Sequence, residues 1–233
     1  MLNCENVQIR QGNFVLRADI AFTKETITAL IGPSGAGKST LLSVLAGFLA
    51  PSAGRILYES ADITDLSPGE RPISILFQDN NLFPHLTVAQ NAGLALQPRL
   101  ALSSKEQTKV MQVLDQVGLN GMGDRRPAAL SGGQQSRAAL ARVLLADRPV
   151  VLLDEPFAAL GPGLKDEMLD LVQQTLLKAG RTVIMVTHDP ADAKQVAGET
   201  VLVADGIAAA PVPTTELFAS PPPALASYLG QSG

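Results

Sequence analysis

A glycine-rich run between residues 32 and 40 has the residue types and the spacing needed to hold a phosphate group. It matches the pattern G-x-x-x-x-G-K-[ST], in which backbone N–H groups surround a phosphate, the lysine reaches the outer phosphates and the hydroxyl binds Mg²⁺. An ordinary glycine-rich turn is the alternative, but the run joins a strand-like stretch to a helix-like one, as phosphate binding requires. The residues predicted to contact a nucleotide here are Gly32, Pro33, Ser34, Gly35, Ala36, Gly37, Lys38, Ser39 and Thr40.

Two adjacent carboxylates, Asp154 and Glu155, follow the apolar run VVLL. A strand covered on both faces gives such a run, and an open parallel sheet places its ligands at the carboxyl ends of its strands. Asp154 therefore fits a role near Mg²⁺, and Glu155 fits the role of a base that polarises an attacking water. The alternative is a pair that only ends the strand and caps the segment after it.

Two more polar residues end apolar runs, Gln78 after ISILF and His188 after TVIMVT. An amide at the carboxyl edge of a parallel sheet can contact Mg²⁺ or the water, and His188 would lie at the same edge. Each is a weak signal alone, because a histidine after a strand is usually packed or solvated. His85, the other histidine, lies in a proline-containing loop and is interpreted as a bystander.

A second glycine-rich stretch, LSGGQ, precedes a helical pattern and contains Ser131, Gly132, Gly133 and Gln134. The N-terminus of a helix favours anions, so this stretch is a second candidate for phosphate binding. The same residues also form a capping box, because Gln134 stands three residues after Ser131. The spacing alone leaves both interpretations open.

Apolar periodicity predicts the elements that position these residues. Alternation between Cys4 and Phe22 predicts a pair of short antiparallel strands, and the runs TITALI, ISILFQ, VVLLD, TVIMV and TVLVA predict buried strands. Helical patterns over 38–47 and 164–180 alternate with those strands, which predicts an α/β fold with a mainly parallel sheet. The polar, helical stretch over about 79–146 predicts a helical subdomain inserted into a single domain that spans 1–233.

Composition excludes several classes of protein. The 233 residues carry a net charge of −4 with a sequence pI near 5.2, and the scattered Lys and Arg give no footprint for nucleic acid. The single cysteine, Cys4, cannot form an internal disulfide and suits a reducing compartment. No apolar run reaches the about 18 residues that span a bilayer, and the first residues lack a secretory signal. We therefore expect a cytoplasmic protein with no nucleic-acid partner.

In their order along the chain, the phosphate loop, Gln78, LSGGQ, VVLLDEP and His188 resemble the ATP-binding subunits of ABC transporters, and the resemblance covers nearly the whole chain. It implies a P-loop NTPase core of the ABC ATPase type, with ATP and Mg²⁺ as ligands. The residues it implies for hydrolysis are Lys38, Gln78, Glu155 and His188. The residues it implies for holding Mg²⁺, directly or through water, are Ser39, Gln78 and Asp154.

The resemblance also implies an assembly. Two copies would form a homodimer head to tail, so that Ser131, Gly133 and Gln134 of one copy bind the γ-phosphate held by the phosphate loop of the other. The pair would drive integral-membrane permease subunits from the cytoplasmic face of the inner membrane, and a periplasmic solute-binding protein would be an indirect partner. A soluble ABC ATPase acting on ribosomes or DNA would usually join two cassettes or carry long coiled coils, and neither is present.

The runs SILFQDNNLFPHLTVAQNAGLAL and LLSVLAGFLAPSAG resemble the ATP-binding subunits of bacterial thiamine importers, with Asn80 and Asn81 as the most specific feature. The ATP-binding subunits of importers of polyamines, iron, or oxyanions such as sulfate and molybdate share much of this sequence. An exporter also stays open, because the energy-coupling residues do not encode direction. Leu82 and Phe83 would form either part of a groove for a membrane subunit or local core.

Two positions depart from the family's pattern. Gly161 stands where the family commonly has an aspartate that helps the two sites communicate, so coupling between the sites does not carry over. The family stacks adenine on an aromatic residue near positions 10–14. This chain offers Phe14 there or, by stacking of a guanidinium group, Arg10.

Overall fold

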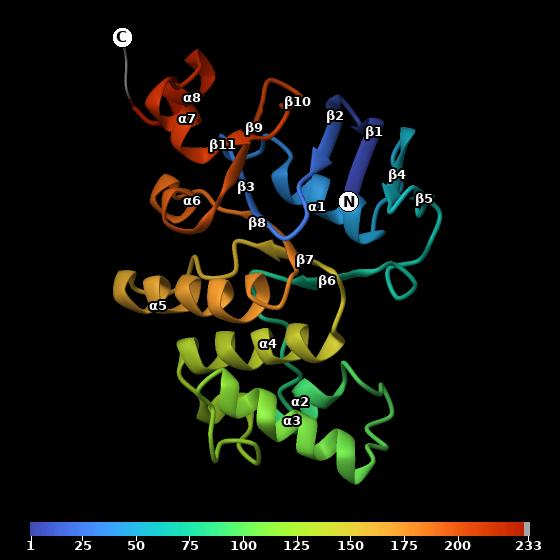
Figure 1. Cartoon of the computed structure of the whole chain (residues 1–233), viewed down its shortest axis with the longest axis vertical. Coiled ribbons are helices and arrows are strands. Elements are labelled where there is room, and N and C mark those ends of the chain that lie inside the picture. The colour runs from blue at the N-terminus through green and yellow to red at the C-terminus, as the bar shows by residue number, and fades with distance from the viewer. Residues whose placement is uncertain (231–233) are drawn as a thin grey trace.

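The strands join into one sheet that has a parallel and an antiparallel part (Figure 1). The computed structural model describes residues 1–230, and within them eleven strands follow the order β5-β4-β1-β2-β10-β9-β3-β8-β7-β6, with β11 paired to β9. The strands are β1 (Leu2–Gln11), β2 (Phe14–Phe22), β3 (Ile27–Ile31), β4 (Ala53–Tyr58), β5 (Ala61–Asp62), β6 (Ile73–Leu76), β7 (Val150–Asp154), β8 (Thr182–Val186), β9 (Glu199–Ala204), β10 (Ile207–Ala208) and β11 (Val212–Pro213).

Helices pack on both faces of the parallel part (Figure 1). Helix α1 follows β3 and lies on one face, whereas α5 and α4 lie beyond β7 on the other. The helices are α1 (Lys38–Ala46), α2 (Val88–Gly93), α3 (Ser104–Gln116), the 3₁₀ turn η1 (Pro127–Ala129), α4 (Gly132–Ala146), α5 (Pro162–Val172), its π-helical continuation η2 (Gln173–Leu177), α6 (Pro190–Val196), α7 (Thr214–Ala219) and α8 (Pro223–Tyr228).

The parallel strands bring the ends of several loops to one edge of the sheet. Strand β3 pairs in parallel with β8 and β9, β8 pairs with β7, and β7 pairs with β6. Leu30 is level with Val186, which is also level with Asp154. The segments that follow β3, β7 and β8 therefore start side by side, as a ligand site at the carboxyl edge requires.

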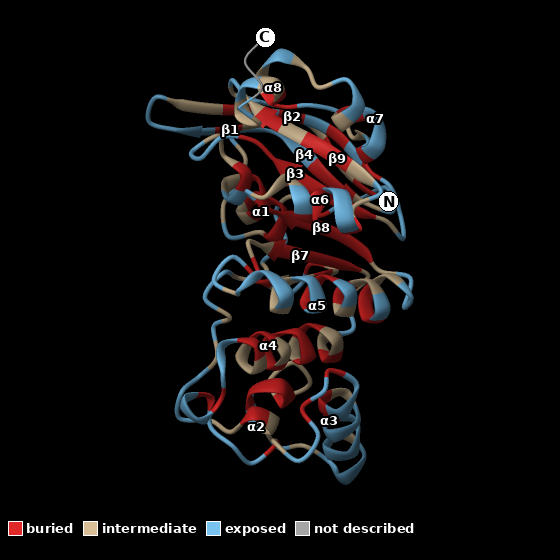
Figure 2. Ribbon diagram, turned by 90° about the vertical axis from the view of Figure 1, so that its left-hand side faces the viewer, coloured by how far each residue is buried: buried red, intermediate tan, exposed pale blue. Residues whose placement is uncertain are grey.

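Strand β7 shows why these runs are apolar throughout. Val150 and Leu152 belong to the core cluster that contains α1, while Val151 and Leu153 belong to the cluster that contains α4 and α5. All four side chains are buried, because successive residues of a strand point to opposite faces and both faces are covered (Figure 2). The alternation of apolar and polar residues that marks a strand with one exposed face is therefore absent from β7.

Helices α2, α3 and α4 form a layer at the end of the molecule opposite β1 and β2 (Figures 1 and 2). Each begins at a capping box, with Thr87, Ser103 and Ser131 as the N-cap residues. Asn91 of α2 is fully buried, and its side chain forms hydrogen bonds with the backbone of Phe83, Leu86 and Thr87. These helices fall within the range predicted for an inserted lobe, and the boundaries of that lobe stay a prediction.

The predicted fold class is confirmed, with a mainly parallel core, an antiparallel part and a helical part. The antiparallel pair predicted between residues 4 and 22 is present as β1 and β2. The strand predicted as ISILFQ is shorter, because β6 ends at Leu76 and leaves Gln78 in the following turn. Strand β4 had no clear periodic signal, since its first three residues are exposed.

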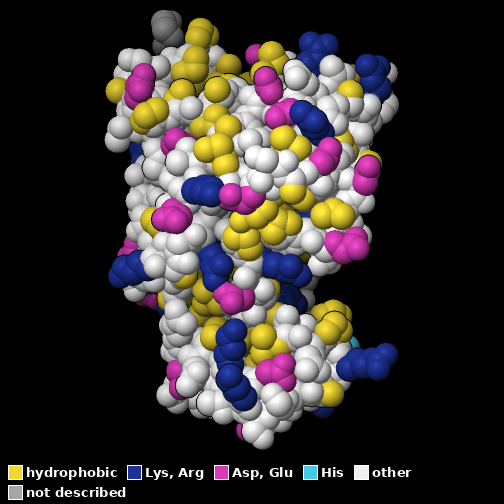
Figure 3. Space-filling model, turned by 45° about the vertical axis from the view of Figure 1, so that its right-hand side comes forward, with side chains coloured by type: hydrophobic (Ala, Val, Ile, Leu, Met, Phe, Trp, Pro, Cys, Tyr) yellow, Lys and Arg dark blue, Asp and Glu magenta, His cyan; other side chains and the backbone are white. Residues whose placement is uncertain are grey.

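Within residues 1–230, no helix combines the length and the apolar character needed to cross a membrane. The face shown in Figure 3 carries Lys and Arg side chains interspersed with Asp and Glu rather than a field of one sign. This mixed pattern agrees with the small net charge of the chain.

Candidate active site

The glycine-rich run forms the loop between β3 and α1, as predicted. Gly32 has φ 144°, and a Cβ added there would lie 2.0 Å from the carbonyl oxygen of Val203, so only glycine fits. Gly37 has φ 101° and is the N-cap of α1, with no side chain to cap the helix. The N–H groups at the start of α1 are therefore available to an anion.

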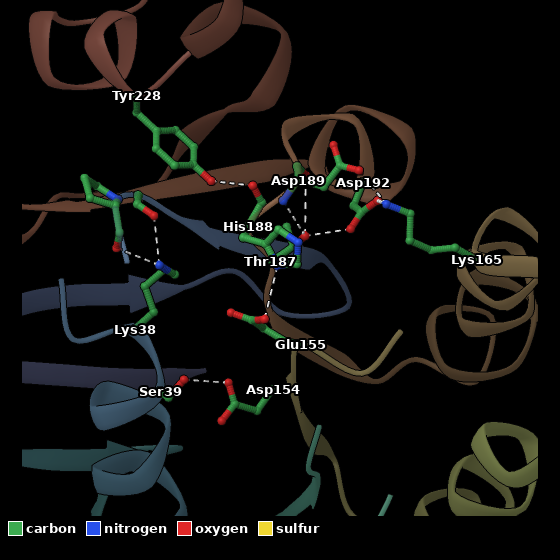
Figure 4. Close-up of polar contacts among 12 residues, drawn as sticks. Lys38, Ser39, Asp154, Glu155, Lys165, Thr187, His188, Asp189, Asp192 and Tyr228 are labelled. Atoms are coloured by element: carbon green, nitrogen blue, oxygen red, sulfur yellow. Dashed lines mark hydrogen bonds and ion pairs between the residues drawn. The ribbon is translucent and has the colours of Figure 1, made fainter. Parts of the chain in front are cut away.

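Lys38 is the first residue of α1, and its side chain turns back along the loop. Its ammonium group donates hydrogen bonds to the carbonyl oxygens of Gly32 at 2.8 Å and Pro33 at 2.9 Å (Figure 4). Burial lowers the pKa of Lys38, and the negative charges of Glu155 and Asp154 oppose part of this shift. The loop thus holds a cation beside the two carboxylates.

Ser39 and Asp154 meet across the junction of α1 and β7. The Ser39 hydroxyl donates a hydrogen bond of 2.8 Å to Oδ1 of Asp154 (Figure 4). Burial raises the pKa of Asp154; the hydrogen bond from Ser39 lowers it, the charge of Glu155 raises it further and the charge of Lys38 lowers it. A hydroxyl and a carboxylate whose charge is only partly compensated are a donor pair that suits Mg²⁺, which needs few protein ligands when it keeps water and phosphate oxygens.

Glu155 and His188 lie at the carboxyl ends of β7 and β8. Nδ1 of His188 lies 3.1 Å from Oε2 of Glu155 (Figure 4). Glu155 has φ 45°, an uncommon value for a residue other than glycine, and its N–H donates to the carbonyl oxygen of Val186. That hydrogen bond fixes the backbone of Glu155 to the last residue of β8, the strand that leads to His188.

Lys38, Ser39, Glu155 and His188 all line one cleft of about 770 Å³. The phosphate loop, Glu155 and His188 line it, together with two aromatic residues, Phe14 and Tyr228. Of the two candidates for stacking on adenine, the structure places Phe14 in the wall of the cleft, where its ring is so near the loop that a Cβ on Gly37 would touch it. Arg10 is exposed and does not line the cleft.

Two predicted parts of the site lie outside this cleft. Gln78 is exposed in the turn after β6, and Ser131, Gly132, Gly133 and Gln134 lie at the N-terminus of α4. Both halves of the predicted capping box are present, because the Ser131 hydroxyl accepts from the N–H of Gln134 and the Gln134 side chain accepts from the N–H of Ser131. The capping interpretation is therefore confirmed, and it leaves anion binding at this terminus open.

Gly133 has a packing role that its motif does not reveal. It is buried, and a Cβ added there would lie 2.5 Å from Cδ2 of Leu164, so α4 approaches α5 closely at this point. Gly161 is the N-cap of α5 and offers no capping side chain. The space around Gly161 is open, because nothing lies within 4 Å of an added Cβ.

The apolar pair predicted after Gln78 divides between two environments. Leu82 is partly buried against the core cluster that contains α2, α3 and α4. Phe83 is 46% exposed and lines a surface groove with residues of β6, α4 and the segment after α2. One residue therefore belongs to the local core, whereas the other is available to a partner.

The sequence patterns did not predict a network of ion pairs and hydrogen bonds that involves Thr187 and Asp189, the residues on either side of His188. Lys165 of α5 pairs with Asp189 and, at 2.7 Å, with Asp192 of α6, while Asp192 accepts a hydrogen bond of 2.6 Å from Thr187 (Figure 4). Hydrogen bonds from Lys165 and from the N–H of Ala191 lower the pKa of Asp189. The only available signal was the repeated acidic spacing after His188, which a helix N-terminus explains equally well.

The chain closely resembles known proteins along its whole length. A family model described as ABC transporter matches residues 16–158. The thiamine import ATP-binding protein ThiQ of Cereibacter sphaeroides is 57% identical over 99% of this chain and 100% of the relative, and the protein of the same name from Ruegeria sp. is 53% identical over the same shares.

Solved structures of ATP-binding cassettes are also similar to this chain. A nucleotide-free ATP-binding cassette from an ABC transporter superposes with a TM-score of 0.87 at 26% identity, covering 98% of both chains. A dimeric cassette in a post-hydrolysis state, bound to ADP and Pi, superposes with a TM-score of 0.78 at 26% identity, covering 92% of this chain and 99% of the other.

The fold and the cleft thus define an ATP-binding cassette, a nucleotide site built from a phosphate loop and a carboxylate pair at one sheet edge. The family model covers more than half of the chain and the relatives exceed half identity, so the chain belongs to the ABC transporter family.

Proposed function

We propose that this chain is the ATP-hydrolysing subunit of an ABC importer for thiamine or its phosphates. The observation that supports it most directly is the near full-length similarity to relatives named as thiamine import ATP-binding proteins, at 57% and 53% identity. The cleft supports the ATPase part independently, since it joins a phosphate loop to a carboxylate that faces an imidazole.

In this proposal, the loop between residues 32 and 40 binds the phosphates of ATP through backbone N–H groups. Lys38 leaves its carbonyl partners for the β- and γ-phosphates, because a phosphate oxygen carries more negative charge than a carbonyl oxygen. Phe14 contacts the base. When bound, Mg²⁺ neutralises charge that develops on the phosphates, and Ser39 and Asp154, with Gln78 through water, would hold it.

Glu155 is proposed to orient and polarise the attacking water. Its backbone is fixed to β8 and its carboxylate faces His188, so the base needs little reorganisation at the moment of reaction. His188 and Lys38 would stabilise charge on the γ-phosphate. Ser131, Gly132, Gly133 and Gln134 would complete the site of a second copy, because they lie outside the cleft of their own chain.

The assembly proposed is a head-to-tail homodimer bound to integral-membrane permease subunits, with a periplasmic solute-binding protein as an indirect partner. This places the chain as a peripheral protein on the cytoplasmic face of the inner membrane. Phe83 and its groove are proposed to contact a permease subunit.

The test is uptake of labelled thiamine at low external concentration by cells of the source organism that lack this gene. Complementation with the wild-type chain should restore uptake, and the Glu155→Gln variant should not, because it binds ATP without turning it over. Expression of both chains, measured by immunoblot, is the control. Uptake that never depends on the gene would overturn thiamine as the solute and direct the search to polyamines, iron and oxyanions.

A further inference from the structure

The last described helix, α8, reaches back to the active-site cleft. Tyr228 at its end lines the cleft with Gly35 and His188. Its hydroxyl donates a hydrogen bond to the backbone carbonyl oxygen of His188, 40 residues away in the sequence (Figure 4). A wall of the cleft is thus made by a segment that carries none of the nucleotide-binding motifs.

The position of Tyr228 is fixed by apolar packing rather than by the cleft itself. Leu225, one turn earlier in α8, is fully buried in a cluster with Ala29 and Ile31 of β3 and with Ala193 of α6. Tyr228 is partly buried against the same cluster. The helix is therefore anchored to the strand that leads into the phosphate loop and to the helix that follows His188.

The residues on either side of His188 have contacts of their own. The N–H of Thr187 donates to the carbonyl oxygen of Leu30, and its hydroxyl donates to Asp192. Asp189 is held by Lys165 and caps α6 through the N–H of Ala191. Tyr228 completes this set from the opposite side, by holding the carbonyl group of His188 itself.

We propose that Tyr228 is a positioning residue for ATP hydrolysis, which keeps the His188 imidazole facing Glu155 by holding the His188 carbonyl group. This inference rests on the proposed ATPase function. The phenol suits the task because its O–H is protonated at neutral pH even at the ordinary pKa of about 10. Burial, followed by the charges of Asp189 and Glu155, raises this pKa further. The hydrogen bond couples the C-terminal helix to the catalytic histidine.

The test is Tyr228→Phe in the purified full chain, since this change removes the hydroxyl and keeps the ring. Loss of one hydrogen bond, worth about 1 kcal/mol, should lower the turnover number for MgATP about fivefold while the KM stays within about twofold. Tyr58→Phe is the matched control, because Tyr58 is the other tyrosine and lies on β4, away from the cleft. It should leave turnover unchanged.

A second readout does not require hydrolysis. The chain has two histidines, so its imidazole NMR spectrum contains two sets of signals, and His188→Ala assigns them. Tyr228→Phe should shift or broaden the His188 signals and leave those of His85 unchanged. If these signals move while the wild-type chain hydrolyses no ATP, the positioning role stands and the proposed function fails.

Unchanged His188 signals in Tyr228→Phe would overturn the inference whether or not turnover is lost, because Tyr228 would then act by another route. Parental turnover in this variant would also overturn it. Shifted signals together with reduced turnover and an unaltered KM are the expected result.

Discussion

Asp154, which we propose as a Mg²⁺-holding residue, lowers the stability of the fold. Its pKa is raised chiefly by burial, so the folded chain holds the proton more tightly than the unfolded chain does. The stability of the fold therefore falls as the pH rises from 3.8, the ordinary pKa of an aspartate, through the raised pKa of Asp154, and the cost remains in full at neutral pH.

Asp154→Asn should therefore stabilise the chain at pH 7 while it lowers ATP turnover. A gain of about 1 kcal/mol would raise Tm by about 2–4 °C, and the loss of a group proposed to hold Mg²⁺ should cost about 10–100-fold in turnover. The asparagine oxygen can still accept from Ser39. Thermal unfolding at pH 7 and pH 3 checks this, because the gain should vanish at pH 3, where the wild-type carboxyl is protonated.

Asp124→Asn is the control, because Asp124 is exposed, and this substitution should change neither Tm nor turnover. A lower Tm for Asp154→Asn at pH 7 would show that the carboxylate at this position stabilises the fold, against the direction of its pKa shift.

Residues of the site were predictable where a short motif fixes their geometry. Lys38, Ser39 and Glu155 follow strands in a pattern that has one known spatial outcome, so their meeting at one sheet edge could be foreseen. Tyr228 and Lys165 could not, because each contacts the His188 segment through tertiary packing of α8 or α5. A single tyrosine near the end of a chain carries no periodic or motif signal.

At the scale of elements, α5 begins without a capping side chain. Gly161 has extended backbone angles, φ −67° and ψ 159°, that any N-cap residue adopts, and the space beside it is open. The family's aspartate would fit there, accept a hydrogen bond from the first turn and complement the helix dipole. Gly161 therefore leaves the N-terminal end of α5 less stable than a capping residue would.

Gly161→Asp should be more stable than Gly161→Ala by about 1 kcal/mol, since both lose the flexibility of glycine and only aspartate caps the helix. Urea unfolding of the two variants at pH 7 measures the difference. Equal unfolding midpoints would mean that α5 gains nothing from a cap, and the departure from the family's pattern would then have no consequence for this helix.

Elements were predicted best where apolar residues fill both faces of a strand or repeat along one helix face. The parallel strands met this condition, as did α1, which was predicted over 38–47. Strand β4 did not, because its first three residues are exposed. It is placed by its pairing with β1. Its pairing depends on contacts distant in sequence, which no local period encodes.

At the scale of the whole molecule, the two glycine-rich segments lie in different parts of the structure. The phosphate loop lies in the cleft beside the sheet, whereas LSGGQ opens α4 next to the layer of α2 and α3 (Figure 1). Neither Ser131 nor Gln134 lines the cleft of its own chain. We propose above that the second segment binds the nucleotide of another copy, and a similar cassette is dimeric.

This arrangement predicts that the Glu155→Gln chain dimerises only with MgATP, because the unhydrolysed nucleotide joins the two copies. Adding Ser131→Arg should abolish the dimer, since a long side chain would occupy the space of the γ-phosphate. Size-exclusion chromatography with light scattering measures the mass. Ser103→Arg is a matched control, because Ser103 caps α3 through the same kind of capping box, and its loss costs a similar amount of about 1 kcal/mol. A Ser131→Arg chain that still dimerises would place LSGGQ outside the interface between the copies.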